Sequence, residues 1–131
     1  MGAQQRTAIA QPVSDACTKV HPDGEAPALC ATFTARNRAG GEAWIQVLAG
    51  NINMAYPFAD DPVARFRLAN AFGPLKASEL IDWQAGNYVT WETSGVAPRD
   101  VAFLVDRFFT TILGCDDATY EPAVTMEDLD A

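Results

Sequence analysis

Hydrophobic and polar residues follow a helical period between Arg99 and Leu113, near the end of the chain. At about 100° per residue, the apolar side chains of this segment form one broad face. That face consists of Val101, Leu104, Val105, Phe108 and Ile112. Phe103 points the other way, among Asp106, Arg107 and Thr110. The segment therefore predicts an amphipathic helix with one aromatic side chain outside the core.

Five shorter segments have the composition or the period-two alternation of β-strands. Leu29–Ala35, Glu42–Leu48 and Ile52–Tyr56 are joined by turn residues and predict a three-strand meander. Leu80–Trp83 and Tyr88–Thr93 flank a short Gly-containing connection and predict a second hairpin. The pattern therefore favours a five-stranded antiparallel sheet.

A second helix is predicted between the meander and the hairpin. Asp60 and Asp61 precede Pro62, which is a typical helix start, and Gly73 and Pro74 end the segment. Such a helix would cross over from the third strand to the fourth. With the C-terminal helix it predicts an α+β fold that packs its helices mainly on one side of the sheet.

The two ends of the chain carry weaker signals. Residues 1–28 are interrupted by Pro12 and further prolines, so we expect a poorly ordered segment with at most a short helix over Ala3–Ala10. Residues 115–131 are acidic and poor in apolar residues, which predicts a mobile tail. The tail is either a solubilising extension or a self-peptide that covers a binding surface. A single domain over residues 29–114 remains.

The charge is uneven and excludes one class of partner. The chain of 131 residues has a net charge of −8, and six acids but no Lys or Arg lie in its last sixteen residues. An acidic chain without a basic patch repels phosphate backbones, so we expect no nucleic-acid partner. No segment approaches the length of a membrane span or a signal peptide. We therefore expect a cytoplasmic protein without a membrane partner.

The residues that carry chemistry do not form a catalytic or metal-binding pattern. Cys17, Cys30 and Cys115 are widely spaced, without a CxxC pair, which favours reduced thiols. His21 is the only histidine, and it lies in a region rich in Pro and Gly that offers no orienting partner. A metal site on this segment would mix hard and soft ligands, namely Asp15, Cys17, His21 and Asp23. We expect no catalytic residue, no metal and no cofactor.

Apolar surface is more informative than polar chemistry. Trp44 and Leu48 lie on the face of their strand opposite Ala43, Ile45 and Val47. An antiparallel sheet with exposed Trp, Met and Leu is a surface that a peptide or a second subunit would cover. We therefore predict a peptide-binding surface made of Trp44, Leu48, Met54 and Tyr56.

The order of strand, hairpin, crossover helix, hairpin and final helix resembles the type III secretion chaperone and YbjN-like group of small α+β domains. The resemblance lies in Trp44–Val47, Asn53–Phe58, Asp82–Tyr88 and Val101–Gly114. It implies a non-catalytic domain that dimerises and holds an extended client protein. It also implies a first helix before Leu29, where this chain is broken by proline. In such a domain the last helix contributes to pairing, so Phe103 and Arg107 on its outer side become candidate dimer contacts.

Three hypotheses for function follow. The first is a chaperone-like module that binds a client protein or peptide and forms a homodimer. The second is a homodimeric interaction domain whose apolar surface meets only its own copy. The third is a small thiol-dependent enzyme that uses Cys115, which is disfavoured because a helix C-terminus raises a thiol pKa.

Overall fold

The structure of the protein is a computed structural model that describes residues 3–22, 24, 26–58, 79–84 and 86–129. The crossover helix predicted at Asp60 to Phe72 lies outside these residues. The described elements are two helices, a π-helical turn and six strands. In chain order they are α1 (Ala3–Thr18), β1 (Leu29–Arg36), β2 (Glu42–Leu48), β3 (Asn51–Tyr56), β4 (Glu79–Gln84), β5 (Asn87–Glu92), α3 (Pro98–Arg107), the turn η1 (Phe108–Ile112) and β6 (Ala123–Asp128).

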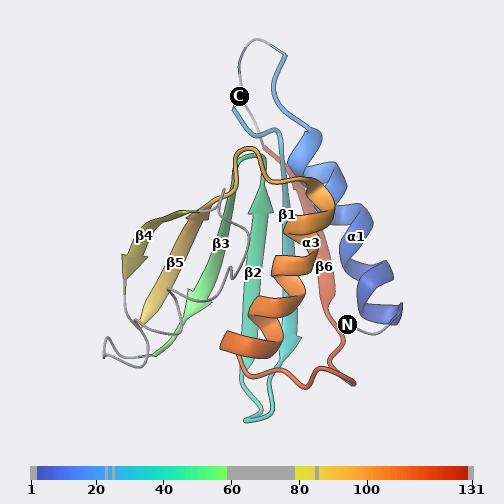
Figure 1. The fold of residues 1–131 in the computed structure, drawn as a ribbon, viewed down its shortest axis with the longest axis vertical. Helices are drawn as coiled ribbons and strands as arrows, with labels where there is room; N and C mark the ends of the chain where they lie inside the picture. Colours follow the sequence, from blue (N-terminus) through green and yellow to red (C-terminus); the bar gives the residue numbers. More distant parts are fainter. Residues whose placement is uncertain (1–2, 23, 25, 59–78, 85, 130–131) are drawn as a thin grey trace.

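The strands form one antiparallel sheet in the order β4-β5-β3-β2-β1-β6. Figure 1 shows α1 and α3 side by side on one face of this sheet. The α+β class is confirmed, but the sheet has six strands rather than five. The sixth, β6, is added to the edge of β1, and β4 forms the opposite edge.

The core lies between the sheet and the helices. Phe33 pairs with Ile45, Ile45 with Met54, and Met54 with Val89, so that four fully buried side chains form one row across neighbouring strands. The ring of Phe108 stacks on Trp91 with 5.6 Å between the ring centroids. This row and the rings packed above it determine which face of each strand is buried.

The N-terminal helix is longer than the sequence predicted. Pro12 lies inside α1, although an internal proline removes one helical hydrogen bond and costs about 3 kcal/mol. Ile9 and Val13 on either side of it are fully buried against the core. Burial of two such side chains contributes about 1.5–3 kcal/mol each, which offsets the cost of the proline. The expectation of a frayed segment ending near Ala10 was therefore wrong.

The final helix changes its winding at its end. It begins at Pro98, one residue before the predicted start, and continues as the π-helical turn Phe108–Ile112 before Gly114, whose φ is +77°, ends it. Phe108 and Phe109 are both fully buried. The periodicity predicted a core position for Phe108 only, because a regular α-helix turns the next residue by about 100°.

The segment that follows this helix is not a mobile tail. Cys115 and Tyr120 are buried, and β6 pairs with β1 along six residues. All six side chains of β6 are exposed. The strand is therefore held by backbone pairing and has no buried face, which is why a hydrophobic pattern did not predict it.

Three buried polar side chains join the C-terminal segment to both helices. The Tyr120 hydroxyl donates a hydrogen bond to Oδ1 of Asp106 on α3, and Nε2 of Gln5 on α1 donates to the Tyr120 carbonyl at 2.9 Å. All three residues are at most 5% exposed. Burial, and to a smaller extent the hydrogen bond to Asp106, raises the pKa of Tyr120 well above its usual range. Asp106, expected on the polar side of the helix, is thus part of the interior.

We expect Tyr120→Phe to lower the free energy of unfolding by about 1–3 kcal/mol, because it leaves the buried Asp106 carboxylate without this donor. Urea denaturation measures the change. Tyr88→Phe is the matched control, because its hydroxyl donates to Asp82 at 2.7 Å on the surface. The control should change stability by less than about 0.5 kcal/mol. Equal effects of the two substitutions would contradict a structural role for the buried bond.

Candidate functional site

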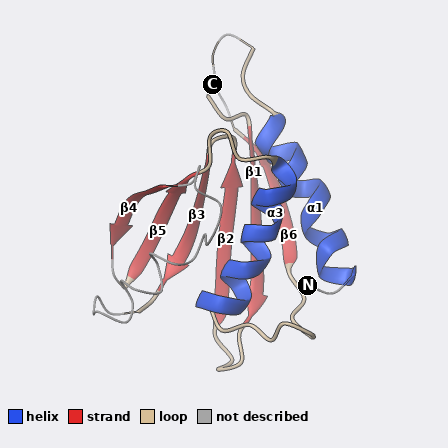
Figure 2. Cartoon of the chain, viewed as in Figure 1, coloured by secondary structure: helices blue, strands red, loops and turns tan. Residues whose placement is uncertain are grey.

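The outer face of the sheet is the side turned away from α1 and α3 (Figure 2). Along β2, buried side chains alternate with half-exposed ones, and the half-exposed positions Trp44, Gln46 and Leu48 belong to this face. The strand registers extend the alternation across the sheet. The outer face is therefore a continuous surface, built from every second residue of each strand.

A row of polar side chains crosses this face. Thr32 pairs with Gln46, Gln46 with Asn53, Asn53 with Thr90, and Thr90 with Asp82. Thr90 donates a hydrogen bond to Asn53 at 2.9 Å, and Asn53 donates to Gln46 at 3.4 Å. These two hydrogen bonds join the side chains of β2, β3 and β5 along the row.

An aromatic patch lies next to the polar row and consists of Trp44 on β2, Ala55 on β3 and Tyr88 on β5. Ala55 pairs with Tyr88, and Trp44 precedes Ile45, whose partner Met54 precedes Ala55. Ala55 is only 8% exposed although neither α1 nor α3 covers it. Its cross-strand neighbours on this face are the half-exposed rings of Trp44 and Tyr88.

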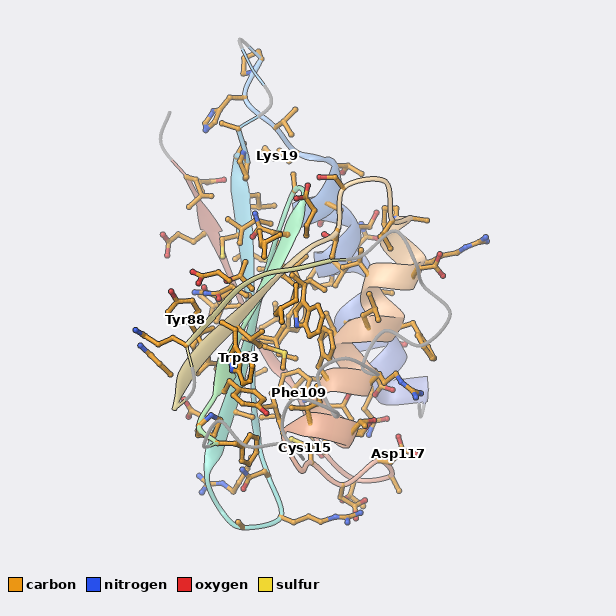
Figure 3. All side chains as sticks on the ribbon, turned by 60° about the vertical axis from the view of Figure 1, so that its left-hand side comes forward. Lys19, Trp83, Tyr88, Phe109, Cys115 and Asp117 are labelled. Carbon is orange, nitrogen blue, oxygen red and sulfur yellow. The ribbon has the colours of Figure 1, made fainter. Side chains whose placement is uncertain are left out.

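The Tyr88 ring is held in place by the edge hairpin. Its hydroxyl donates to Oδ2 of Asp82 on β4 at 2.7 Å. This hydrogen bond to a carboxylate raises the pKa of Tyr88 above its ordinary value. Figure 3 shows Tyr88 on the side of the sheet away from the helices, whereas Phe109 lies between the sheet and the helices. The Tyr88 ring is therefore oriented by a hydrogen bond within the protein.

The structure divides the four predicted peptide-binding residues between two faces. Trp44 and Leu48 are half-exposed on the outer face, on either side of Gln46. Met54 and Tyr56 are 0% exposed and belong to the core beneath the helices. The expectation that all four share one surface was wrong, because Met54 pairs with Ile45 and faces the same way. Tyr56 packs edge-on against Phe58 and Trp83.

Two members of the patch, Ala55 and Tyr88, were missed by sequence reasoning. The signal for Tyr88 was present, because Val89 and Trp91 alternate with Tyr88 and Thr90 along β5. The second hairpin also contains two larger aromatic residues, Trp83 and Trp91. Trp83 and Trp91 prove to be on the buried side.

The candidate dimer contacts lie on the opposite side of the molecule. Phe103 on α3 is 46% exposed, and Arg107, one turn further along the helix, is also exposed. The predicted outward position of Phe103 is confirmed. It is the exposed aromatic of a helix whose other large apolar side chains are buried.

Other surface features offer less chemistry. A cleft of about 530 Å³ at the β1–β2 turn is lined by polar residues including Arg36, Arg38 and Asp116. Arg38 and Asp116 form an ion pair at 3.4 Å, so their opposite charges offset each other within the cleft. Within the described part of the chain, no three His, Cys, Asp or Glu side chains gather as a metal site. Neither described helix is long and apolar enough to cross a membrane.

Comparison with known proteins adds no identification: no protein-family model, no curated protein and no solved structure matches this chain.

The surroundings of the three cysteines disfavour the thiolate form of each side chain. Burial raises the pKa of Cys17 to about 11, and burial also raises the pKa of Cys30 and of Cys115. A raised pKa keeps a thiol protonated at neutral pH, whereas the thiolate is the reactive form. Cys115 also lies beyond the end of η1, buried among core residues.

We therefore expect Cys17 to react with iodoacetamide at pH 7.5 at least about 100-fold more slowly than an unstructured cysteine, whose pKa is near 8.5. Because the pKa of Cys17 lies above the tested range, its rate should keep rising about tenfold per pH unit from pH 8 to 10, while an unstructured thiol levels off. Mass spectrometry of the alkylated peptides follows each site, with the urea-unfolded protein as control. A rapidly modified thiol in the native protein at pH 7.5 would revive the thiol-enzyme hypothesis.

Proposed function

We propose that this protein is a non-catalytic, chaperone-like binding module that holds an extended client segment against the outer face of its sheet. The aromatic patch carries the proposal. Trp44 and Tyr88 are half-exposed and flank the small residue Ala55, and neither α1 nor α3 covers them. Large, half-exposed rings on a sheet face offer an apolar contact surface to a side chain of a client.

The energetics suit a moderate, reversible interaction. Each apolar side chain that a client buries contributes about 1.5–3 kcal/mol, and ordering of the client removes part of this gain. Three or four such contacts give micromolar affinity. Leu48, on the far side of the polar row, supplies a second apolar contact for a client that runs along β2.

Charge supports a preference among clients. Glu42 and Glu92 lie on the outer-face positions of β2 and β5, and the whole chain carries a net charge of −8. Basic residues that flank the apolar part of a client would meet a favourable potential at the rim. Exposed charges of this kind steer association and specificity more than they add affinity.

A homodimer without a client is the second candidate, and one observation favours it. Phe103 exposes 46% of its surface on the outer side of α3, next to Arg107. A twofold contact through this side of the helix would bury both copies of the ring. The contact is separate from the aromatic patch, because the two surfaces lie on opposite sides of the sheet. The proposed dimer and the proposed client binding can therefore be tested one at a time.

We expect Trp44→Ala and Tyr88→Ala each to weaken client binding at least about tenfold, because truncation of a central aromatic contact costs about 1.4 kcal/mol or more. Client is recovered with the protein from its native host and identified by quantitative mass spectrometry. Its affinity for each variant is then measured by calorimetry. Phe103→Ala is the matched control, since it removes an exposed ring from the other side of the molecule. A client affinity that is unchanged in both the Trp44→Ala and the Tyr88→Ala variant would contradict the proposal.

We also expect the wild-type protein to be a dimer by light scattering and Phe103→Asp to be a monomer, because a charged group at this position opposes burial of the contact. Circular dichroism checks that the variant keeps its fold. A variant that remains dimeric would remove Phe103 from the interface. A monomeric wild type would exclude the homodimer.

A further inference from the structure

β6 is the least buried of the strands with described side chains. It pairs with β1 in antiparallel register from Leu29 opposite Asp128 to Thr34 opposite Ala123 (Figure 1). All six of its side chains are exposed, and even Val124 and Met126, on the helix side of the sheet, are each 39% exposed. Its attachment therefore depends mainly on the backbone ladder to β1, with further contacts to α1.

The segment just before β6 is anchored independently. Tyr120 is buried and bonded to Asp106 and Gln5, as described above. Residues 121–122 alone separate this anchor from the strand, and two extended residues reach about 7 Å at most. Release of β6 from β1 would leave this anchor in place and would give up only the contacts that β6 itself makes with α1. The short tether also hinders exchange of β6 between two copies of the protein. In such an exchange, the Tyr120 anchor of one copy would have to lie next to the β1 edge of the other.

Two hydrogen bonds show which backbone groups of β1 point to this edge. The Leu129 amide donates to the Ala28 carbonyl at 3.0 Å, and the Asn37 amide donates to the Gly41 carbonyl at 2.9 Å on the β2 side. Because backbone groups alternate along a strand, even-numbered residues of β1 face β6 and odd-numbered residues face β2. Cys30, Thr32 and Thr34 thus present their donors and acceptors to whichever strand occupies the edge.

We propose that the outer edge of β1 is a strand-addition site for an extended segment of a partner protein, and that β6 is its resident, replaceable occupant. β6 itself shows the chemistry that fits: apolar residues at two alternate positions, as at Val124 and Met126, and an acid two residues further on. Asp128 supplies that acid, with its carboxylate 3.9 Å from Nζ of Lys19. Both ionic groups are well exposed, so the pair orients a strand more than it adds affinity. This site uses backbone recognition and does not rest on the aromatic patch.

Hydrogen exchange in the intact protein tests whether the edge opens. The amides of Cys30, Thr32 and Thr34 should exchange at least tenfold faster than those of Ala31 and Phe33, which face β2, because release of β6 exposes one set and not the other. NMR resolves the two sets along the same strand. Equal protection of even and odd amides would show that β6 opens only with the whole domain, and would overturn the proposal.

A proline substitution tests replacement. By the same parity, the Thr125 amide points to β1 and the Val124 amide points to solvent. Thr125→Pro should break the ladder. Val124→Pro introduces the same residue one position earlier and should leave the ladder in place, because proline is tolerated at the outward-facing positions of an edge strand. The probe is a labelled peptide of residues 121–129, measured by fluorescence anisotropy.

We expect the Thr125→Pro protein to bind this peptide at least tenfold more tightly than the wild type, because the tethered competitor is gone. Val124→Pro should bind it as the wild type does, and the same peptide with proline in place of Thr125 should not bind, because it lacks an amide that points to β1. A Thr125→Pro protein that keeps its β1–β2 amide protection but does not bind the peptide would overturn the proposal. So would equal binding of the proline-containing peptide, or a strand-exchanged dimer by light scattering. Trp44→Ala should leave this binding unchanged, which separates the edge from the aromatic patch.

Discussion

The register of the central strands is the constraint on which the rest of the structure depends. Phe33, Ile45, Met54 and Val89 stand opposite one another beneath the helices, and all four are fully buried. Side chains alternate along each strand, so burial of this row sends Trp44 and the other outer-face residues to the opposite side. A slip of one residue would reverse both faces at once. The same packing that stabilises the domain therefore determines which aromatic rings remain available.

The tight turn between β2 and β3 explains the error in the predicted binding surface. Alternation within each strand was visible in the sequence, but the phase of one strand relative to the next was not. Ala49 and Gly50 form a two-residue connection, with Gly50 at a φ of +91°, and they make Leu48 pair with Asn51. That pairing puts Ile52 and Met54 on the buried face. Turn length and strand period, taken together, are enough to assign Met54 and Trp44 to opposite faces of the sheet.

The two ends of the chain show where hydrophobic patterns stop being informative. α1 was predicted too short because the local helix propensity at Pro12 is low. Burial of Ile9 and Val13 against the core stabilises the helix on both sides of this proline, and local propensity does not include that contribution. β6 was missed for the opposite reason. It has no buried face, and its alternation is limited to Val124 and Met126, which is too short a pattern to indicate a strand without the pairing with β1. The buried bond between Tyr120 and Asp106 has no sequence signature at all, since it joins residues on separate elements.

The two proposed surfaces meet along the strand register, although one uses side chains and the other uses the backbone. Ala123 on β6 pairs with Thr34, and Thr34 pairs with Trp44. With strands about 4.8 Å apart, the outer-face position now held by Ala123 lies about 10 Å from the Trp44 backbone, within reach of a long side chain. Ala123 is too small to cross that distance. A partner strand with a large apolar residue at this position would join the β1 edge to the aromatic patch, which β6 in the same place cannot do.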